Sequence, residues 1–272
     1  MAIDLAALWD YSKPALSEER FRAEVVRAAP DDAFILQTQI ARTWGLRKDF
    51  TQAREILASV EPKLDSVSPE AKVRWLLEMG RTWASPAHSK EQRTPEAKEK
   101  ARAFNLRAFE TARQAALDGL AIDALHMMVM VDEGPQQQLE WNMKAIALME
   151  ASPQPAAKKW AGALYNNVGY AHHEAGRDDQ AIEFYKKSLA AYEAAGRTSE
   201  VRIAHWMIAN ALRTQGKLHE ALAIQQRLER EWDAAGEPDP YVYEELEAIH
   251  RALGDEKLAQ HYAAKQRAAK GQ

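Results

Sequence analysis

Three histidines, His172, His173 and His205, are the residues of this sequence that most resemble a set of metal ligands. His172 and His173 are adjacent in a segment with helical spacing, and neighbouring residues of an α-helix point about 100° apart. They therefore cannot easily share one ion, and the i, i+4 pair of a His-Glu-x-x-His zinc helix is absent. We predict structural histidines and no metal site.

Other catalytic groups are missing from the sequence or have a simpler explanation. The absence of cysteine removes thiol nucleophiles, disulfides and thiolate metal sites. A Gly-rich phosphate loop, a Gly-x-Ser-x-Gly elbow and a dinucleotide fingerprint are also absent. The carboxylate pairs at residues 31–32 and 178–179 stand at predicted helix starts, where capping and the helix dipole explain them. We therefore predict no cofactor and no enzymatic activity; a catalytic pocket between Asp123 and His173 is the remaining alternative.

The charge balance argues against two further classes of partner. The chain has 36 Lys and Arg against 40 Asp and Glu, a net charge of −4. Nucleic-acid-binding domains usually show clustered basic residues, which are missing here. No segment approaches the roughly 18 apolar residues that a membrane span needs, and the N-terminus lacks the pattern of a secretory signal. We expect a cytoplasmic protein that binds neither nucleic acid nor membranes.

Helix-forming residues dominate the composition. Ala, Leu, Glu, Gln, Lys and Arg are frequent, whereas the 12 Gly and 11 Pro are spaced along the chain rather than clustered. No run of alternating β-branched residues is bounded by Asn-Gly or Asp-Gly turns, so strand signals are missing. The composition predicts an all-α fold.

A repeat of about 40 residues organises the predicted helices. Residues 181–196 and 221–236 each start with Ala and end on Ala-Ala-Gly, at an offset of 40. Gly176 and Gly216 keep the same offset, and each follows a segment with helical apolar spacing. Residues 139–145 align with residues 182–188 at an offset of 43. A shared register of this kind predicts similar, stacked structural units.

Each unit is predicted to contain two helices joined by a short turn. In the clearest unit, helices over residues 160–175 and 178–195 flank Gly176, which can adopt the left-handed conformation that ends a helix. The small residues Gly169 and Ala181 let the two helices approach closely. Neither helix can bury its apolar face alone, so neighbouring pairs must stack.

Pairs of small residues twelve positions apart recur along the chain: Gly169 and Ala181, Ala209 and Ala221, and Ala41 and Ala53. With aromatic residues around them, these pairs resemble the pattern of the tetratricopeptide repeat (TPR) family. The resemblance implies an all-α, right-handed α-solenoid of about six helix pairs with an extra N-terminal helix.

The resemblance also implies a division of the chain. An N-terminal helical cap is expected over residues 1–31, with its helix starting near Ser17, and a TPR-like α-solenoid over residues 32–270. The period of 38–43 residues is longer than the usual 34. Residues 85–95 are predicted to be an inserted loop.

In TPR proteins the first helix of each pair lines the concave side. The resemblance therefore implies a peptide-binding surface made of first-helix residues that point away from the packing seam. These candidates are Arg81, Asp123, Asn166, Tyr170, His173, Trp206, Asn210, Arg213 and Tyr241, together with Arg42, Met127 and Glu244. Asn can bond a peptide backbone, Tyr and Trp supply contact area, and Arg can bind a carboxylate. Alternatively, the charged members are solvated helix faces.

The leading hypothesis is a scaffold or adaptor that binds a protein or peptide in this concave groove. A peptide-responsive sensor is the second, because the long period resembles that of helical-repeat regulators in bacteria. A self-assembling module, which would form homo-oligomers, is the third. The Lys/Asn clamp by which some TPR proteins hold a C-terminal carboxylate cannot be placed on this sequence, since no Lys stands among the candidates.

Overall fold

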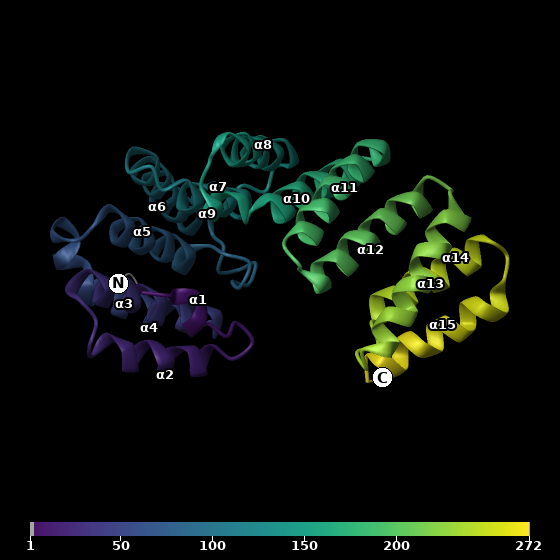
Figure 1. Ribbon diagram of the computed structural model, residues 1–272, viewed down its shortest axis with the longest axis horizontal. Coiled ribbons are helices and arrows are strands. Elements are labelled where there is room, and N and C mark those ends of the chain that lie inside the picture. The colour runs from purple at the N-terminus through teal and green to yellow at the C-terminus, as the bar shows by residue number, and fades with distance from the viewer. Residues whose placement is uncertain (1–2, 272) are drawn as a thin grey trace. The chain divides into compact units, whose positions relative to one another are not determined.

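The structure, a computed structural model, describes residues 3–271 (Figure 1). Helices and their connections make up this range, and no β-strand occurs within it. The chain forms two compact units, one ending at Trp160 and the other starting at Ala161. The predicted all-α fold of stacked helix pairs is therefore confirmed.

Three helix pairs and several short helices form the N-terminal unit. Its elements are α1 (Leu5–Leu8), α2 (Pro14–Val25), α3 (Pro30–Leu46), α4 (Phe50–Val60), the 3-10 helix η1 (Glu61–Ser66), α5 (Pro69–Trp83), α6 (Pro95–Gln114), α7 (Asp118–Val131), α8 (Pro135–Ala151) and α9 (Pro155–Lys158). The pairs are α3 with α4, α5 with α6, and α7 with α8.

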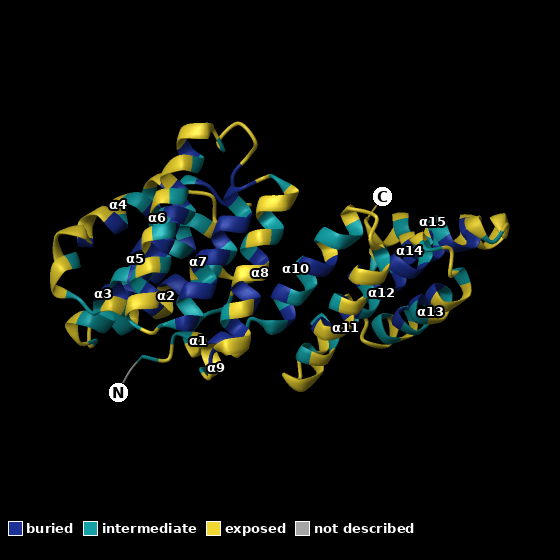
Figure 2. Cartoon of the chain, turned by 90° about the horizontal axis from the view of Figure 1, so that it is seen from above, coloured by how far each residue is buried: buried dark blue, intermediate teal, exposed yellow. Residues whose placement is uncertain are grey.

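Three more pairs form the C-terminal unit: α10 (Ala161–Glu174) with α11 (Asp178–Ala194), α12 (Thr198–Thr214) with α13 (Leu218–Ala234), and α14 (Pro240–Ala252) with α15 (Glu256–Ala269). The described residues thus contain six pairs, in agreement with the sequence. Along most helices one face is buried and the other exposed, as the alternating colours of Figure 2 show.

Proline and small polar residues set where many helices begin. Proline is the first residue of α2, α3, α5, α6, α8 and α14, where its missing N–H costs no intrahelical bond. Ser68 and Thr94 cap α5 and α6 by accepting from the N–H groups of Ala71 and Ala97. The N-terminal helix does not start near Ser17, where it was expected. That helix begins at Pro14, and the Ser17 hydroxyl instead bonds the backbone of Asp10.

The turns differ between the units. Gly176, Gly216 and Gly254 join the helices of the three C-terminal pairs with positive φ angles of 69°, 76° and 82°. In the N-terminal unit, Lys48 and Ala116 take up this left-handed conformation, with φ angles of 66° and 54°. A side chain with a Cβ atom is strained there. Backbone hydrogen bonds hold both turns: Asp49 N donates to Trp44 O at 3.0 Å, and Leu117 N donates to Ala112 O at 2.8 Å.

Close helix contacts occur where the sequence places small residues. A Cβ atom on Gly169 would lie 2.6 Å from ring atoms of Tyr185, which is fully buried. In the N-terminal unit, a Cβ atom on Gly80 would lie 2.4 Å from Asn105 Oδ1. The predicted close approach of the two helices at Gly169 is therefore confirmed.

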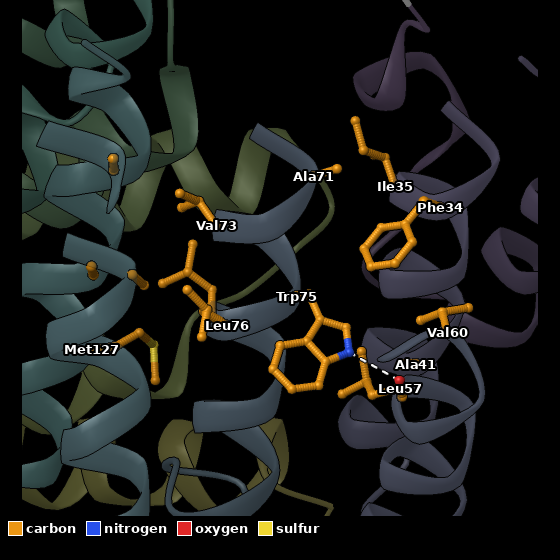
Figure 3. Packing of buried hydrophobic residues seen from close by; sticks show 14 of the residues in the cluster. Phe34, Ile35, Ala41, Leu57, Val60, Ala71, Val73, Trp75, Leu76 and Met127 are labelled. Atoms are coloured by element: carbon orange, nitrogen blue, oxygen red, sulfur yellow. Dashed lines mark hydrogen bonds between the residues drawn. The ribbon is translucent and has the colours of Figure 1, made fainter. Parts of the chain in front are cut away.

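The core of the N-terminal unit lies between α3, α4, α5, α6 and α7. Trp75 donates its indole N–H to the Leu57 carbonyl oxygen at 2.9 Å and packs beside Phe34 and Val60 (Figure 3). Met127 belongs to this core with an exposed fraction of 5%, so its prediction as an outward-facing residue is wrong.

The predicted division at residue 31 stays a prediction. Phe21 of α2 packs on Leu36 and Ile40 of α3, which agrees with a covering role for α2. The predicted inserted segment connects α5 with α6, although Pro95 is already the first residue of α6. Within it, His88 stacks on Phe50 with ring centroids 3.5 Å apart.

Candidate functional site

Some first helices of successive pairs lie against one another in each unit. In the N-terminal unit α5 contacts both α3 and α7, and in the C-terminal unit α12 contacts α14. Side chains on these helices that are not used in packing therefore share a surface. Of the nine main candidates, six lie on α10 and α12, Tyr241 lies on α14, and Arg81 and Asp123 lie in the N-terminal unit.

Four charged residues form a chain of ion pairs across α3, α5 and α7. Glu78 Oε1 accepts from Arg42 Nη1 at 3.1 Å and from Arg81 Nη1 at 2.6 Å. Arg81 Nη2 in turn donates to Asp123 Oδ1 at 2.5 Å. Glu78 is only 3% exposed, so its charge depends on the two guanidinium groups. Arg81 and Asp123, both predicted site residues, thus meet in one network.

The Asp123 carboxyl of the network stays ionised at neutral pH. Burial alone would raise the pKa of the Asp123 carboxyl, but the Arg81 and Arg42 guanidinium groups outweigh burial and hold that pKa below its ordinary value. Burial lowers the pKa of the nearby His126 imidazole, and Arg81 lowers it further against the opposing effect of Asp123. Two cations, two anions and a neutral imidazole therefore face this region.

A pocket of about 430 Å³ opens beside the network. Besides the four charged residues and His126, its walls are Gly45, Leu46, Ser85, Pro86, Ala87, Met127, Met130 and Trp160. A second pocket of about 320 Å³ shares Asp123 and Trp160 with the first and adds Glu70, Arg74, Leu117 and Leu120. Both pockets lie within the N-terminal unit. Pockets with apolar walls and a few convergent polar groups are the usual form of a ligand site.

Gly45 leaves space on the α3 side of the larger pocket. It lies in α3, and a Cβ atom built there would meet no other atom within 4 Å. A side chain at this position could therefore extend into the pocket without a clash at its base. A large side chain at position 45 would therefore fill the pocket without removing any existing contact.

In the C-terminal unit, Asn210 and Arg213 are joined through a carboxylate. Asn210 Nδ2 donates to Glu245 Oε1 at 2.8 Å, and Arg213 Nε donates to Glu245 Oε2 at 2.8 Å. Glu245 is 5% exposed. A ligand carboxylate would have to compete with Glu245 for both side chains, so they are less available than the sequence suggested.

Two tyrosines among the C-terminal candidates are largely exposed. Tyr170 is 50% exposed and Tyr241 61% exposed. Trp206 is half-buried, and its indole N–H donates to the backbone oxygen of Tyr241 at 3.2 Å. Trp206 and Tyr241 are thus brought together, and neither Trp206 nor Asn210 is sealed in the core.

The remaining candidates have internal contacts. His173 Nδ1 lies 2.6 Å from Asp178 Oδ1 at the start of α11. Asn166 Oδ1 is buried without a hydrogen-bond partner. Glu244 is exposed and accepts from Gln266 Nε2 at 2.6 Å. Whether these residues bind a partner stays a prediction.

Sequence reasoning missed several residues of the network and pockets. Glu78 stands three positions before Arg81, a spacing that pairs side chains on one helix face, and this signal was available. Glu245 was missed because the helical phase was placed one residue off, at Glu244. Nothing local in the sequence marks His126, Met130 or Trp160, which come together only through the stacking of α7 and the segment after α9.

Among residues 3–271, no three His, Asp or Glu side chains are grouped so that they could hold a metal ion. None of the helices in that range is long and apolar enough to cross a membrane.

Comparisons with known proteins agree with the repeat architecture. Residues 160–230 match the model of the tetratricopeptide repeat family. No curated protein sequence matches the chain.

Several solved structures are similar over most of this chain. One is a signal transduction ATPase with numerous domains from Pyrococcus horikoshii that has a tetratricopeptide repeat sensor, with a TM-score of 0.69 and 10% identity over 93% of this chain and 38% of that one. Another is aspartyl phosphate phosphatase F from Bacillus subtilis, with a TM-score of 0.61 and 17% identity over 91% of this chain and 63% of that one. A third is NprR in complex with its cognate peptide NprX, with a TM-score of 0.55 and 13% identity over 97% of this chain and 76% of that one. This chain spans less than two thirds of the first two proteins, and at these identities the likeness shows the fold alone.

Proposed function

We propose, for a chain that contains tetratricopeptide repeats over residues 160–230, that it binds a peptide or a segment of a partner protein on its first-helix surface. The role we assign is that of a scaffold or adaptor, and it is a binding role rather than a catalytic one. Helical repeats expose long, regular surfaces that suit this task.

The observation that carries the proposal is the pocket of about 430 Å³ in the wall of α3, α5 and α7. Its volume lies in the range of roughly 300–1,000 Å³ in which proteins hold small ligands or anchoring side chains. Met127 and Met130 line one side, and methionine side chains adapt to ligands of different shape. Trp160 adds a large apolar surface.

We propose a further contact surface on the C-terminal unit, made of Tyr170, Trp206 and Tyr241. Exposed tyrosine rings bury large areas on binding and lose little side-chain entropy, so they are frequent at interfaces. Asn210 and Arg213 stand beside this surface but are bonded to Glu245, so we assign them to positioning α12 against α14 as well as to binding.

A peptide-responsive sensor is the second candidate. NprR, which shares the fold, was solved with a cognate peptide bound, and the first protein described above has a tetratricopeptide repeat sensor. A sensor differs from a scaffold in that the ligand must bind two conformations unequally. Small-angle scattering with and without an enriched peptide separates the two roles, since only a sensor changes its dimensions.

The test of binding uses a random 12-residue peptide library displayed against the immobilised full chain. Gly45→Trp fills the larger pocket, and Ala103→Trp adds the same side chain to an exposed position of α6 outside it. We expect peptides enriched on the unsubstituted chain to bind Gly45→Trp at least about tenfold more weakly, and Ala103→Trp with unchanged affinity. Circular dichroism checks that both variants are folded. Failure to enrich any peptide, or equal binding to all three proteins, contradicts the proposal.

A further inference from the structure

The charged residues around the larger pocket neutralise one another. Arg42 and Arg81 share Glu78, and Arg81 also holds Asp123, so the two cations and two anions are all paired within the wall. His126, the other titratable residue of the wall, has a lowered pKa because of burial. The pocket therefore presents polar side chains without a net charge.

We infer that this pocket accepts an uncharged, apolar or aromatic side chain of a bound peptide and discriminates against charged ones. The inference rests on the proposed peptide-binding function and names the residue class that anchors the peptide. Carboxylate recognition, which the sequence left open, is the contrasting possibility.

A charged anchor has no free counter-ion in the wall. An entering carboxylate would face Asp123 and Glu78 and could gain a cation only by drawing Arg42 or Arg81 away from them. An entering ammonium or guanidinium group would face Arg42 and Arg81 in the same way. Because Glu78 is almost fully buried, breaking its pairs leaves an uncompensated buried charge, which is strongly unfavourable.

An uncharged apolar anchor avoids this cost and gains contact area. Met127, Met130 and Trp160 offer apolar surface, and Leu46 is a partly exposed apolar residue at the rim. Burial of such an anchor removes apolar surface from water on both sides. The buried Arg42 Nε has no hydrogen-bond partner, which leaves a donor beside the pocket for a peptide carbonyl oxygen.

The adjoining pocket repeats the same arrangement. Its cation Arg74 donates to Glu70 at 2.9 Å, and Leu117 and Leu120 supply apolar surface. In an extended peptide, residues i and i+2 point to one side at a separation of about 6.6 Å. The two pockets adjoin, since they share Asp123 and Trp160, and the inference extends to a second apolar side chain two residues along the peptide.

The test uses capped single residues, so that it does not depend on finding the natural partner. N-acetyl-phenylalaninamide, N-acetyl-leucinamide, N-acetyl-argininamide and N-acetyl-glutamic acid α-amide are titrated into the full chain labelled with 5-fluorotryptophan. The ¹⁹F resonance of Trp160, assigned through Trp160→Phe, reports binding at the pocket. We expect the phenylalanine and leucine probes to bind on the order of tenfold more tightly than the two charged probes, as burial of one large apolar side chain implies.

Two controls tie the effect to the pocket. Gly45→Trp is expected to abolish the saturable shift, and Ala103→Trp to leave it unchanged. Raising NaCl from 50 to 500 mM is expected to change the affinity of the phenylalanine probe by less than about twofold, since screening affects charged contacts.

The outcomes separate the inference from the proposed function. Charged probes that bind as tightly as the apolar ones, no saturable binding of the apolar probes, or an affinity that falls tenfold in high salt each overturn the inference, even where library peptides still need the open pocket. Apolar probes that bind while no library peptide is enriched support the anchor chemistry and contradict the proposed peptide-binding function.

Discussion

Both units are built from stacked helix pairs, and the pairs of the C-terminal unit are the more regular. In the C-terminal unit, each helix pair turns at a glycine with positive φ, and the family model matches much of this region. In the N-terminal unit, Lys48 turns the pair of α3 and α4 and Ala116 joins α6 to the next pair, both with positive φ. A longer connection separates α5 from α6, and the larger pocket opens in the wall. The regular repeats make the fold recognisable from the sequence, whereas the less regular unit holds the pocket that we propose as a binding site.

The same contrast appears in the acidic residues that join successive first helices. Glu78 in the N-terminal unit binds two arginines, and Arg81 is only 14% exposed. Glu245 in the C-terminal unit binds one arginine, Arg213, which is 29% exposed, together with Asn210. Glu78 and Glu245 therefore occupy comparable positions in the two units.

The largest expected effect is that of Glu78→Ala. The substitution deprives Arg42 of its carboxylate and Arg81 of one of two, and breaking a buried ion pair costs about 3–5 kcal/mol. Glu245→Ala is expected to cost about 1–3 kcal/mol, because Glu245 binds one arginine rather than two. Urea unfolding followed by circular dichroism measures both. An equal or larger loss in the free energy of unfolding for Glu245→Ala would contradict the expectation that the Glu78 network contributes more to stability.

Next in size is Gly169→Ala in the C-terminal unit. The new methyl group would lie 2.6 Å from the Tyr185 ring, which is fully buried and cannot move aside freely. Overpacking of this kind costs typically about 1–3 kcal/mol. The thermal midpoint measures the loss, and a midpoint equal to that of the unsubstituted protein contradicts the close packing described for α10 and α11.

Two substitutions test the difference in turn residues between the units. Gly216→Ala places a Cβ atom at a φ of 76° and is expected to cost about 1 kcal/mol. Ala116→Gly relieves the same strain, and we expect a gain of about 0.5 kcal/mol after the greater freedom of glycine in the unfolded chain is allowed for. Thermal unfolding of the two variants should shift the midpoint in opposite directions, and shifts of the same sign contradict the comparison.

A small gain is also expected from Gly45→Ala. Space is open around this position, and replacing a helical glycine with alanine stabilises by roughly 0.5–1 kcal/mol. Glycine-to-alanine substitution is thus expected to lower the thermal midpoint at Gly169 and to raise it at Gly45. A lower thermal midpoint for Gly45→Ala would mean that the pocket side of α3 is already filled.

Much of the fold could be predicted from the sequence because helix pairs are local structures. The offset of 40 residues and the small residues at Gly169 and Ala181 identified α10 to α13, and the predicted helix over 178–195 lies within one residue of α11. Ser17 was misplaced because a serine before acidic residues resembles a cap, whereas Pro14 sets the helix start.

The candidate site was predictable only in part. Helical phase placed Arg81 and Asp123 on one surface, although they stand 42 residues apart. The same reasoning failed for Glu245, since an error of one residue turns a helical side chain by about 100°. The pocket could not be foreseen, because it depends on a missing side chain at Gly45 and on Trp160, which was expected to begin a helix and instead precedes α10.

The mutual pairing of Arg42, Glu78, Arg81 and Asp123 also bears on how fast a partner arrives. A wall whose charges cancel projects little field into solvent, so it cannot steer an oppositely charged molecule toward itself. Encounters then proceed at the unsteered rate of about 10⁵–10⁶ M⁻¹s⁻¹. Differences between competing partners would accordingly reside in how long each remains bound.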